Sequence, residues 1–183
     1  AIAVKSNPLY KVLSFLKDQN VGAECASWGE CVLALSAGYS PSKIVYDSPC
    51  KTVDDLSKAI QEGISINCDS FEEWARIKSL LGTCSTSSQF GLRLNSQVGM
   101  GSIEATSVVG SYSKFGIPLD NAYEQIISAY LESPNLISIH VHSGSQGCGM
   151  DLLVESIEKV YSVAEFINQE SMALYGKRRI HTF

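Results

Sequence analysis

Short apolar runs rich in β-branched residues alternate along the chain with stretches of helical periodicity. The apolar runs predict seven strands, at Ile2–Lys5, Gly22–Cys25, Ile44–Tyr46, Ser65–Cys68, Phe90–Leu94, Leu136–His142 and Ile180–Phe183. The stretches between them predict helices at Leu9–Lys17, Trp28–Ala37, Val53–Gln61, Phe71–Leu81, Leu119–Leu131 and Leu152–Ala173. A unit of one strand and one helix thus recurs about every 20 to 25 residues, with one longer excursion from Ser96 to Pro118.

Several predicted helices begin and end at recognisable signals. Ser70 with Glu73 three residues later has the spacing of a capping box. Pro118 and Asp120 are suited to open the helix that contains Tyr123. These signals support the helix positions that the periodicity predicts.

Strands that are apolar on both faces and alternate with helices predict a parallel sheet covered by helices. We therefore expect an α/β fold in which residues 1–183 form most of a (β/α)8 TIM barrel, with about seven of its eight strands. A doubly wound open sheet is the alternative, but no Gly-x-Gly-x-x-Gly follows any predicted strand. Polar residues recur where the predicted strands end, at Lys5, Glu24, Asp47, Asp69, Arg93 and His142. In a barrel these ends meet at one mouth, where such enzymes carry out their chemistry.

Composition and charge exclude several classes of function. The 183 residues are 45% hydrophobic and 18% charged, with a net charge of −5, which is typical of a globular protein. The longest basic run is Lys177–Arg179, so nucleic acid is not the expected partner. No apolar run reaches the roughly 20 residues that span a bilayer. The six cysteines are irregularly spaced without a Cys-x-x-Cys pair, which argues against a zinc site and favours a reducing, cytoplasmic compartment.

Four of the strand-end residues suggest a site for a carbonyl cofactor. A lysine that burial drives towards its neutral amine can form a Schiff base, and Lys5 stands at such a strand end. Glu24, Arg93 and His142 would add a carboxylate, a guanidinium and an imidazole around it. A Gly- and Ser-rich turn that contains Ser145 follows His142, and its backbone could meet an anion such as a phosphate. The alternatives are a solvated lysine and a structural histidine, and no third ligand supports a metal site.

Five short motifs resemble those of the pyridoxal-phosphate decarboxylases that act on ornithine, diaminopimelate and arginine, which share a fold with alanine racemase. The first is Ala3-Val4-Lys5-Ser6-Asn7, and the others are Glu24–Glu30, Ser48-Pro49-Cys50-Lys51, Lys114-Phe115-Gly116-Ile117 and His142-Ser143-Gly144-Ser145-Gln146. The segment Leu92-Arg93-Leu94-Asn95 matches a further signature. The motifs follow in the family's order over nearly the whole chain, which makes the combination specific.

The resemblance implies a role for each candidate residue. Lys5 would hold pyridoxal 5'-phosphate as a Schiff base, with Glu24 and Glu30 balancing its charge once substrate displaces it. His142 would stack against the pyridine ring, and Arg93 would line the cofactor pocket. Ser145 would face the phosphate. The implied reaction is loss of the α-carboxylate of a basic amino acid as CO2.

The resemblance also sets expectations about what this sequence lacks. Position 24 is usually Asp in the ornithine enzymes, and here it is Glu24. The family's Asp-x-Gly-Gly-Gly phosphate loop, the eighth strand and a C-terminal β domain do not occur in these 183 residues, so we expect a fragment that is inactive and poorly behaved alone. The resemblance implies a homodimer for the full-length protein.

The substrate and even the activity stay open at this point. The Cys50 turn favours ornithine, whereas Lys114–Ile117 and Gln146 favour diaminopimelate or arginine. Lysine is a further candidate. A non-catalytic regulatory homologue similar to the antizyme inhibitors is one alternative, and a racemase or cofactor carrier on the same barrel is another.

Overall fold

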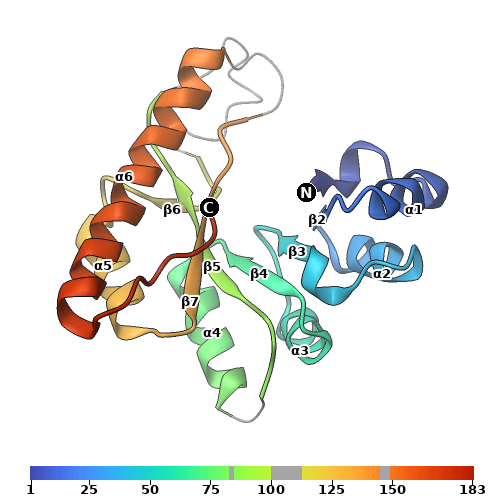
Figure 1. Cartoon of the computed structure of the whole chain (residues 1–183), viewed down its shortest axis with the longest axis horizontal. Coiled ribbons are helices and arrows are strands. Elements are labelled where there is room, and N and C mark those ends of the chain that lie inside the picture. The colour runs from blue at the N-terminus through green and yellow to red at the C-terminus, as the bar shows by residue number, and fades with distance from the viewer. Residues whose placement is uncertain (83–84, 100–112, 145–148) are drawn as a thin grey trace. The chain divides into compact units, whose positions relative to one another are not determined.

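A computed structural model describes residues 1–82, 85–99, 113–144 and 149–183 of the chain. Its strands are β1 (Ile2–Ala3), β2 (Ala23–Cys25), β3 (Ile44–Asp47), β4 (Ser65–Cys68), β5 (Phe90–Asn95), β6 (Ile117–Pro118) and β7 (Leu136–Val141). Its α-helices are α1 (Tyr10–Asp18), α2 (Trp28–Ser36), α3 (Val53–Glu62), α4 (Phe71–Leu81), α5 (Tyr123–Glu132) and α6 (Met150–Tyr175). Two 3-10 turns, η1 (Val4–Ser6) and η2 (Pro41–Lys43), complete the described elements (Figure 1).

The chain divides into two compact units, Ala1–Phe90 and Gly91–Phe183. In the first unit, strands β1 to β4 follow one another in the sheet in chain order. Each of the first three pairs is parallel, with Ala3 opposite Glu24, Cys25 opposite Tyr46, and Asp47 opposite Asn67. Because the strands are parallel and in sequence order, their carboxyl ends lie along one edge of this sheet.

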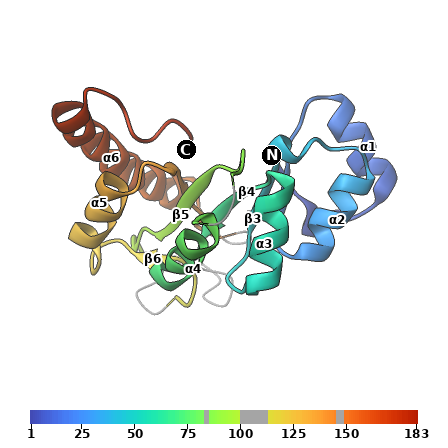
Figure 2. The same cartoon turned by 90° about the horizontal axis from the view of Figure 1, so that it is seen from below.

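Most residues of these strands are buried, which explains why the strands are rich in apolar residues. Ala23 and Cys25 of β2, Ile44 and Tyr46 of β3, and Ile66 of β4 are at most 1% exposed. Helix α2 packs on β2 and β3, while α3 and α4 pack on β4 (Figures 1 and 2). The parallel, helix-covered sheet predicted for this part of the sequence is confirmed.

The predicted helix boundaries in the first unit agree closely with the structure because side chains cap the helices. Helix α4 spans the predicted residues, and the Ser70 hydroxyl accepts a hydrogen bond from the Glu73 N–H at 3.2 Å. Thr52 and Asp55 form a reciprocal capping box at the start of α3. The box predicted for α4 is wrong in its second half, since the Glu73 carboxylate accepts from the N–H of Asp69.

The predicted strand Ile2–Lys5 is too long. Strand β1 contains only Ile2 and Ala3, and the chain turns into η1 directly afterwards. The Ser6 hydroxyl donates to the Ala3 carbonyl at 2.7 Å, and the Asn7 N–H donates to the Val4 carbonyl at 3.1 Å. These local bonds use backbone carbonyls that a longer strand would offer to its neighbour.

In the second unit, β5 pairs with β6 in parallel and also with β7. The Tyr130 hydroxyl from α5 connects β5 to β7, because it accepts from the Leu92 N–H at 3.2 Å and donates to the Ser138 carbonyl at 2.6 Å. The two strands approach so closely that a methyl group on Gly91 would lie 2.7 Å from that same carbonyl oxygen. A glycine is therefore required at position 91.

Two predictions for the second unit need correction. The predicted strand Ile180–Phe183 forms only an isolated bridge between Thr182 and Ser138, because the Asn168 side chain of α6 takes the N–H groups of Arg179 and Ile180. The helix predicted over Leu119–Leu131 begins only at Tyr123. The Leu119 N–H bonds instead to the Asn95 carbonyl, continuing the short strand β6 that the sequence did not predict.

The long helix α6 packs along α5 and β7 and completes this unit (Figures 1 and 2). Its buried face includes Val160, Ala164 and Ile167, at i, i+4 and i+7. Among the described residues, no helix has both the length and the apolar character needed to cross a membrane.

Candidate functional site

Lys5 lies just beyond the carboxyl end of β1, in the turn η1. Its neighbour Val4 is fully buried, but the side chain of Lys5 is exposed. The sequence suggested a buried lysine side chain at this strand end, whereas the structure places it in contact with solvent. What the turn provides is an accessible primary amine at the edge of the sheet where the parallel strands end.

Glu24 lies on β2, the strand that pairs with β1. It pairs in register with Ala3, two residues before Lys5, and its side chain is half-buried. Since successive residues of a strand point to opposite faces, Ala23 and Cys25 fill the core while Glu24 faces away from them. Glu24 therefore lies on the strand next to the one that Lys5 follows, and the functional roles of both residues stay predictions.

Glu30 stands in the first turn of α2, where its carboxylate is held by the backbone. Its Oε2 atom accepts a hydrogen bond from the Ala26 N–H at 2.8 Å, and its own N–H donates to the Ser27 hydroxyl at 3.2 Å. A carboxylate also interacts favourably with the positive end of a helix dipole. The bond from Ala26 fixes the Oε2 atom of the Glu30 carboxylate and leaves its Oε1 atom able to accept a hydrogen bond from another group.

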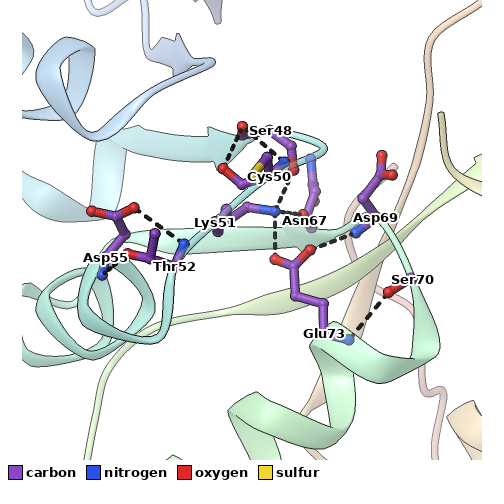
Figure 3. A network of polar contacts seen from close by, with 9 residues as sticks. All are labelled: Ser48, Cys50, Lys51, Thr52, Asp55, Asn67, Asp69, Ser70 and Glu73. Carbon is purple, nitrogen blue, oxygen red and sulfur yellow. Dashed lines mark hydrogen bonds and ion pairs between the residues drawn. The ribbon is translucent and has the colours of Figure 1, made fainter. Parts of the chain in front are cut away.

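A buried lysine, Lys51, lies at the centre of a network of polar contacts in the first unit (Figure 3). The Lys51 ammonium donates to the carbonyls of Ser48 and Asn67 at 2.7 and 2.8 Å, and to Glu73 Oε1 at 2.5 Å. The side chains of Lys51 and Glu73 are 0% and 5% exposed. All three ammonium protons are thereby used, which is the condition for burying a lysine in its charged form.

Glu73 completes this network on the side of α4. Its second carboxylate oxygen accepts from the Asp69 N–H at 3.2 Å, while its own N–H is capped by Ser70. Burial raises the pKa of the Glu73 carboxyl, and the Lys51 ammonium opposes that shift. The pair therefore ties the loop after β3 to the end of β4 and the start of α4.

The first turns of α2 and α4 share one design. In each, a serine caps the N–H of a glutamate three residues later, and that glutamate accepts from the N–H just before the serine. In α4 the remaining oxygen of Glu73 binds Lys51, which follows β3, the strand before the one that leads into α4. Lys5 likewise follows β1, the strand before the one that leads into α2, so its position along the chain relative to Glu30 matches that of Lys51 relative to Glu73.

Arg93 belongs to β5 in the second unit and is 7% exposed. Its guanidinium carbon lies 5.2 Å from the centroid of the Phe115 ring, a distance at which a cation is attracted to an aromatic face. Gly116, at φ +72°, passes so close to β5 that a methyl group on it would lie 3.0 Å from the Arg93 carbonyl oxygen. The Lys114–Ile117 motif is thus packed directly against the strand that carries Arg93.

His142 follows the last residue of β7 and is half-buried, as predicted for a residue at a strand end. Ser143 beside it is buried, and Gly144 adopts φ +136°, which favours glycine. Because β7 pairs with β5, the strand that His142 follows is a neighbour of the strand that carries Arg93. Ser145, the predicted phosphate contact, lies outside the described residues.

The described thiols differ sharply in their surroundings. Cys25, Cys31 and Cys68 are buried and free, whereas Cys50 is exposed. Burial raises the pKa of the Cys68 thiol, with Glu73 adding to the effect and Lys51 opposing it. The Cys68 thiol therefore stays neutral in the folded protein at pH values where a solvated thiol ionises.

This shift predicts a loss of stability in alkali. Above about pH 8.5 the unfolded chain releases the Cys68 proton while the folded chain keeps it, so the free energy of unfolding falls by about 1.4 kcal/mol per pH unit for this one group. Urea unfolding from pH 7 to 10 should show a shallower decline for Cys68→Ala than for the wild type. Ile66→Val in the same strand is the control for lost volume and should keep the wild-type slope. Equal slopes for Cys68→Ala and the wild type would contradict the prediction.

The sequence did not reveal the roles of Lys51 and Phe115. Lys51 was noted only as part of a turn, because its partner Glu73 is 22 residues away. The sequence identifies Ser70 and Glu73 as a helix-capping pair. It does not show that the Glu73 carboxylate also binds Lys51. A repeated pattern in the sequence could have indicated the shared design. The Ser-x-x-Glu spacing occurs at Ser27 and at Ser70, and in both cases a lysine lies one predicted strand earlier in the chain.

Comparison with known proteins gives this arrangement a family. Residues 1–175 match the family described as pyridoxal-dependent decarboxylase, pyridoxal binding domain. Diaminopimelate decarboxylase of Helicobacter pylori is 30% identical over 168 residues, which are 89% of this chain and 41% of that protein. The enzyme of that name from Aquifex aeolicus is 29% identical over 170 residues, 92% of this chain and 40% of its own length.

A solved structure shows the same likeness in three dimensions. The Helicobacter pylori diaminopimelate decarboxylase complexed with L-lysine superposes with a TM-score of 0.81 at 27% identity, covering 97% of this chain and 44% of that one. The α/β class and the TIM-barrel type predicted from the sequence are confirmed, with the barrel incomplete in these 183 residues. The chain spans about two fifths of the length of the relatives it matches. It belongs to the pyridoxal-dependent decarboxylases, of which it carries the pyridoxal-binding domain.

Proposed function

We propose that the protein containing this chain is a lyase that removes the α-carboxylate of an amino acid with a basic side chain, using pyridoxal 5'-phosphate. The observation that carries the proposal is the exposed amine of Lys5, which stands at the carboxyl edge of a parallel sheet beside the carboxylate-bearing strand β2. Membership of the pyridoxal-binding family supplies the cofactor. Carboxyl edges of parallel strands are where barrel enzymes place their reacting groups.

The residues of the first unit fit a cofactor held through an amine. Lys5 offers that amine in an accessible turn, and Glu24 lies in register with the end of its strand. When bound, pyridoxal phosphate supplies a conjugated ring that takes up the electron pair left as the α-carboxylate departs as CO2. Glu30 would receive the Lys5 ammonium through its Oε1 atom, by the arrangement that Glu73 and Lys51 display in α4.

Arg93 and His142 are further residues that we propose as cofactor contacts. Arg93 offers a buried, positively charged guanidinium, and His142 offers an imidazole at the end of the neighbouring strand. We assign Arg93 to the wall of the cofactor pocket and His142 to the face of the pyridine ring. Ser145 remains our proposed contact for the phosphate.

The relatives change the order of the candidate substrates. The ornithine preference inferred from the Cys50 turn finds no particular support, since the relatives named above are diaminopimelate decarboxylases. One of the solved relatives holds L-lysine. We therefore propose diaminopimelate as the first substrate to test, ahead of ornithine, lysine and arginine. A homodimer is our proposal for the assembly of the full-length protein.

A decarboxylation assay tests this proposal directly. The full-length protein is loaded with pyridoxal 5'-phosphate and offered meso-diaminopimelate, L-ornithine, L-lysine and L-arginine separately, while CO2 and the amine product are measured. We expect release of CO2 with diaminopimelate at the highest kcat/KM of the four. CO2 release only with ornithine would reverse the substrate order, and racemised amino acid without CO2 would indicate the racemase alternative. Absence of any turnover together with retained cofactor would favour a non-catalytic homologue.

A further inference from the structure

We propose that Phe115 is a positioning residue that holds the guanidinium of Arg93 in the orientation the cofactor site requires. This inference rests on the proposed function, because it assigns Arg93 to the wall of the cofactor pocket. The proposed function gives Phe115 no role of its own, and Phe115 would act through Arg93, whose guanidinium lies over its ring.

The contact between the two side chains is the first step. The guanidinium carbon of Arg93 lies 5.2 Å from the centroid of the Phe115 ring. Arg93 is buried and Phe115 is half-buried, so water weakens the contact less than it would at an exposed site. An arginine side chain has several accessible rotamers, and contact with an aromatic face favours the rotamer that places the guanidinium charge over the ring.

The backbone holds Phe115 firmly in place, which is the second step. The Phe115 N–H donates to the Ser113 hydroxyl at 3.2 Å. Two residues later, Ile117 pairs with Leu94, the residue after Arg93. Between them Gly116 adopts φ +72° and lies against the β5 backbone, with space for no larger residue. Ring and guanidinium are therefore both anchored to β5 at adjacent positions.

These contacts give a physical reason for the residues of the motif. Gly116 permits the close approach to β5, the pairing of β6 fixes the register, and the Phe115 ring contacts Arg93. A residue without an aromatic ring at position 115 would keep the pairing of β6 but would remove the cation–π contact that orients the Arg93 guanidinium. The effect should therefore appear in the affinity for the cofactor and depend on the presence of Arg93.

A double-mutant cycle in the full-length protein tests this dependence. The dissociation constant of pyridoxal 5'-phosphate is measured by absorbance titration for the wild type, Phe115→Leu, Phe115→Tyr, Arg93→Gln and Phe115→Leu/Arg93→Gln. We expect Phe115→Leu to weaken binding by roughly 2- to 30-fold, the range of a partly buried cation–π contact. Phe115→Tyr, which keeps the ring, should bind within a factor of two of the wild type.

The decisive result is the behaviour without Arg93. Phe115→Leu should cause no further loss in the Arg93→Gln background, and its thermal midpoint should match that of Phe115→Tyr. Equal losses with and without Arg93, or equal losses for Leu and Tyr, would overturn the inference and leave Phe115 as a packing residue. If Phe115→Leu does not fold, Phe115→Met serves as the ring-free variant. A wild type that binds no cofactor would instead refute the proposed function, and the inference with it.

Discussion

Replacing Lys51 with methionine is expected to lower the free energy of unfolding by about 3–5 kcal/mol, the usual cost of breaking a buried ion pair. The variant removes the only ammonium in the network and leaves the carboxylate of Glu73 buried without it. It also leaves the carbonyls of Ser48 and Asn67 without their donor. Urea unfolding of the full-length protein, followed by circular dichroism, measures the difference.

Two further variants isolate the cause of this loss. Lys51→Met/Glu73→Leu removes both charges and should recover part of the stability, because uncompensated charge, rather than lost packing, is the main cost. Lys58→Met is the matched control, since Lys58 is exposed and its ion pair with Asp54, one helical turn away, lies in solvent. It should leave the unfolding curve unchanged. A Lys51→Met curve that matches the control would show that the network does not support the fold.

Replacing Lys5 with alanine is expected to abolish both the near-visible absorbance of the bound cofactor and the release of CO2. Lys5 lies in the turn η1 directly after β1, and its replacement would remove the amine that we propose as the covalent attachment of the cofactor. The fold should be unaffected, because the Lys5 side chain is exposed and fills no space in the core. Absorbance spectra and CO2 assays of the purified full-length variant provide the measurement.

Lys11→Ala is the control for this prediction, since Lys11 is also exposed and lies nearby in α1. It should keep the spectrum and the turnover of the wild type. An unchanged unfolding midpoint for Lys5→Ala would separate loss of chemistry from loss of structure. Retained absorbance and CO2 release in Lys5→Ala would show that the reacting amine is elsewhere.

The strands β2, β3 and β4 could be predicted because most of their residues are buried and many are apolar. Their observed bounds differ from the prediction by one residue at most. The errors fall where side chains compete for backbone groups. The Ser6 hydroxyl takes a carbonyl at the end of β1, and Asn168 takes the N–H groups that a strand at Ile180 would need.

The candidate site was predictable to the extent that its residues lie at strand ends. Glu24 and His142 occur where the alternation of strand and helix put them, and Lys5 follows a shortened β1. Contacts between distant segments carry no local signal, so neither the Lys51–Glu73 pair nor the Arg93–Phe115 contact followed from the sequence. Both form only once the helix or strand that follows has packed against its neighbour.

The most direct test of the central claim is to find the residue that carries the cofactor. The full-length protein is incubated with pyridoxal 5'-phosphate, reduced with borohydride to make the attachment permanent, digested, and mapped by mass spectrometry. We predict that the modified peptide contains Lys5 and that the buried Lys51 is unmodified. Modification of another lysine, with Lys5 left free, would contradict the account.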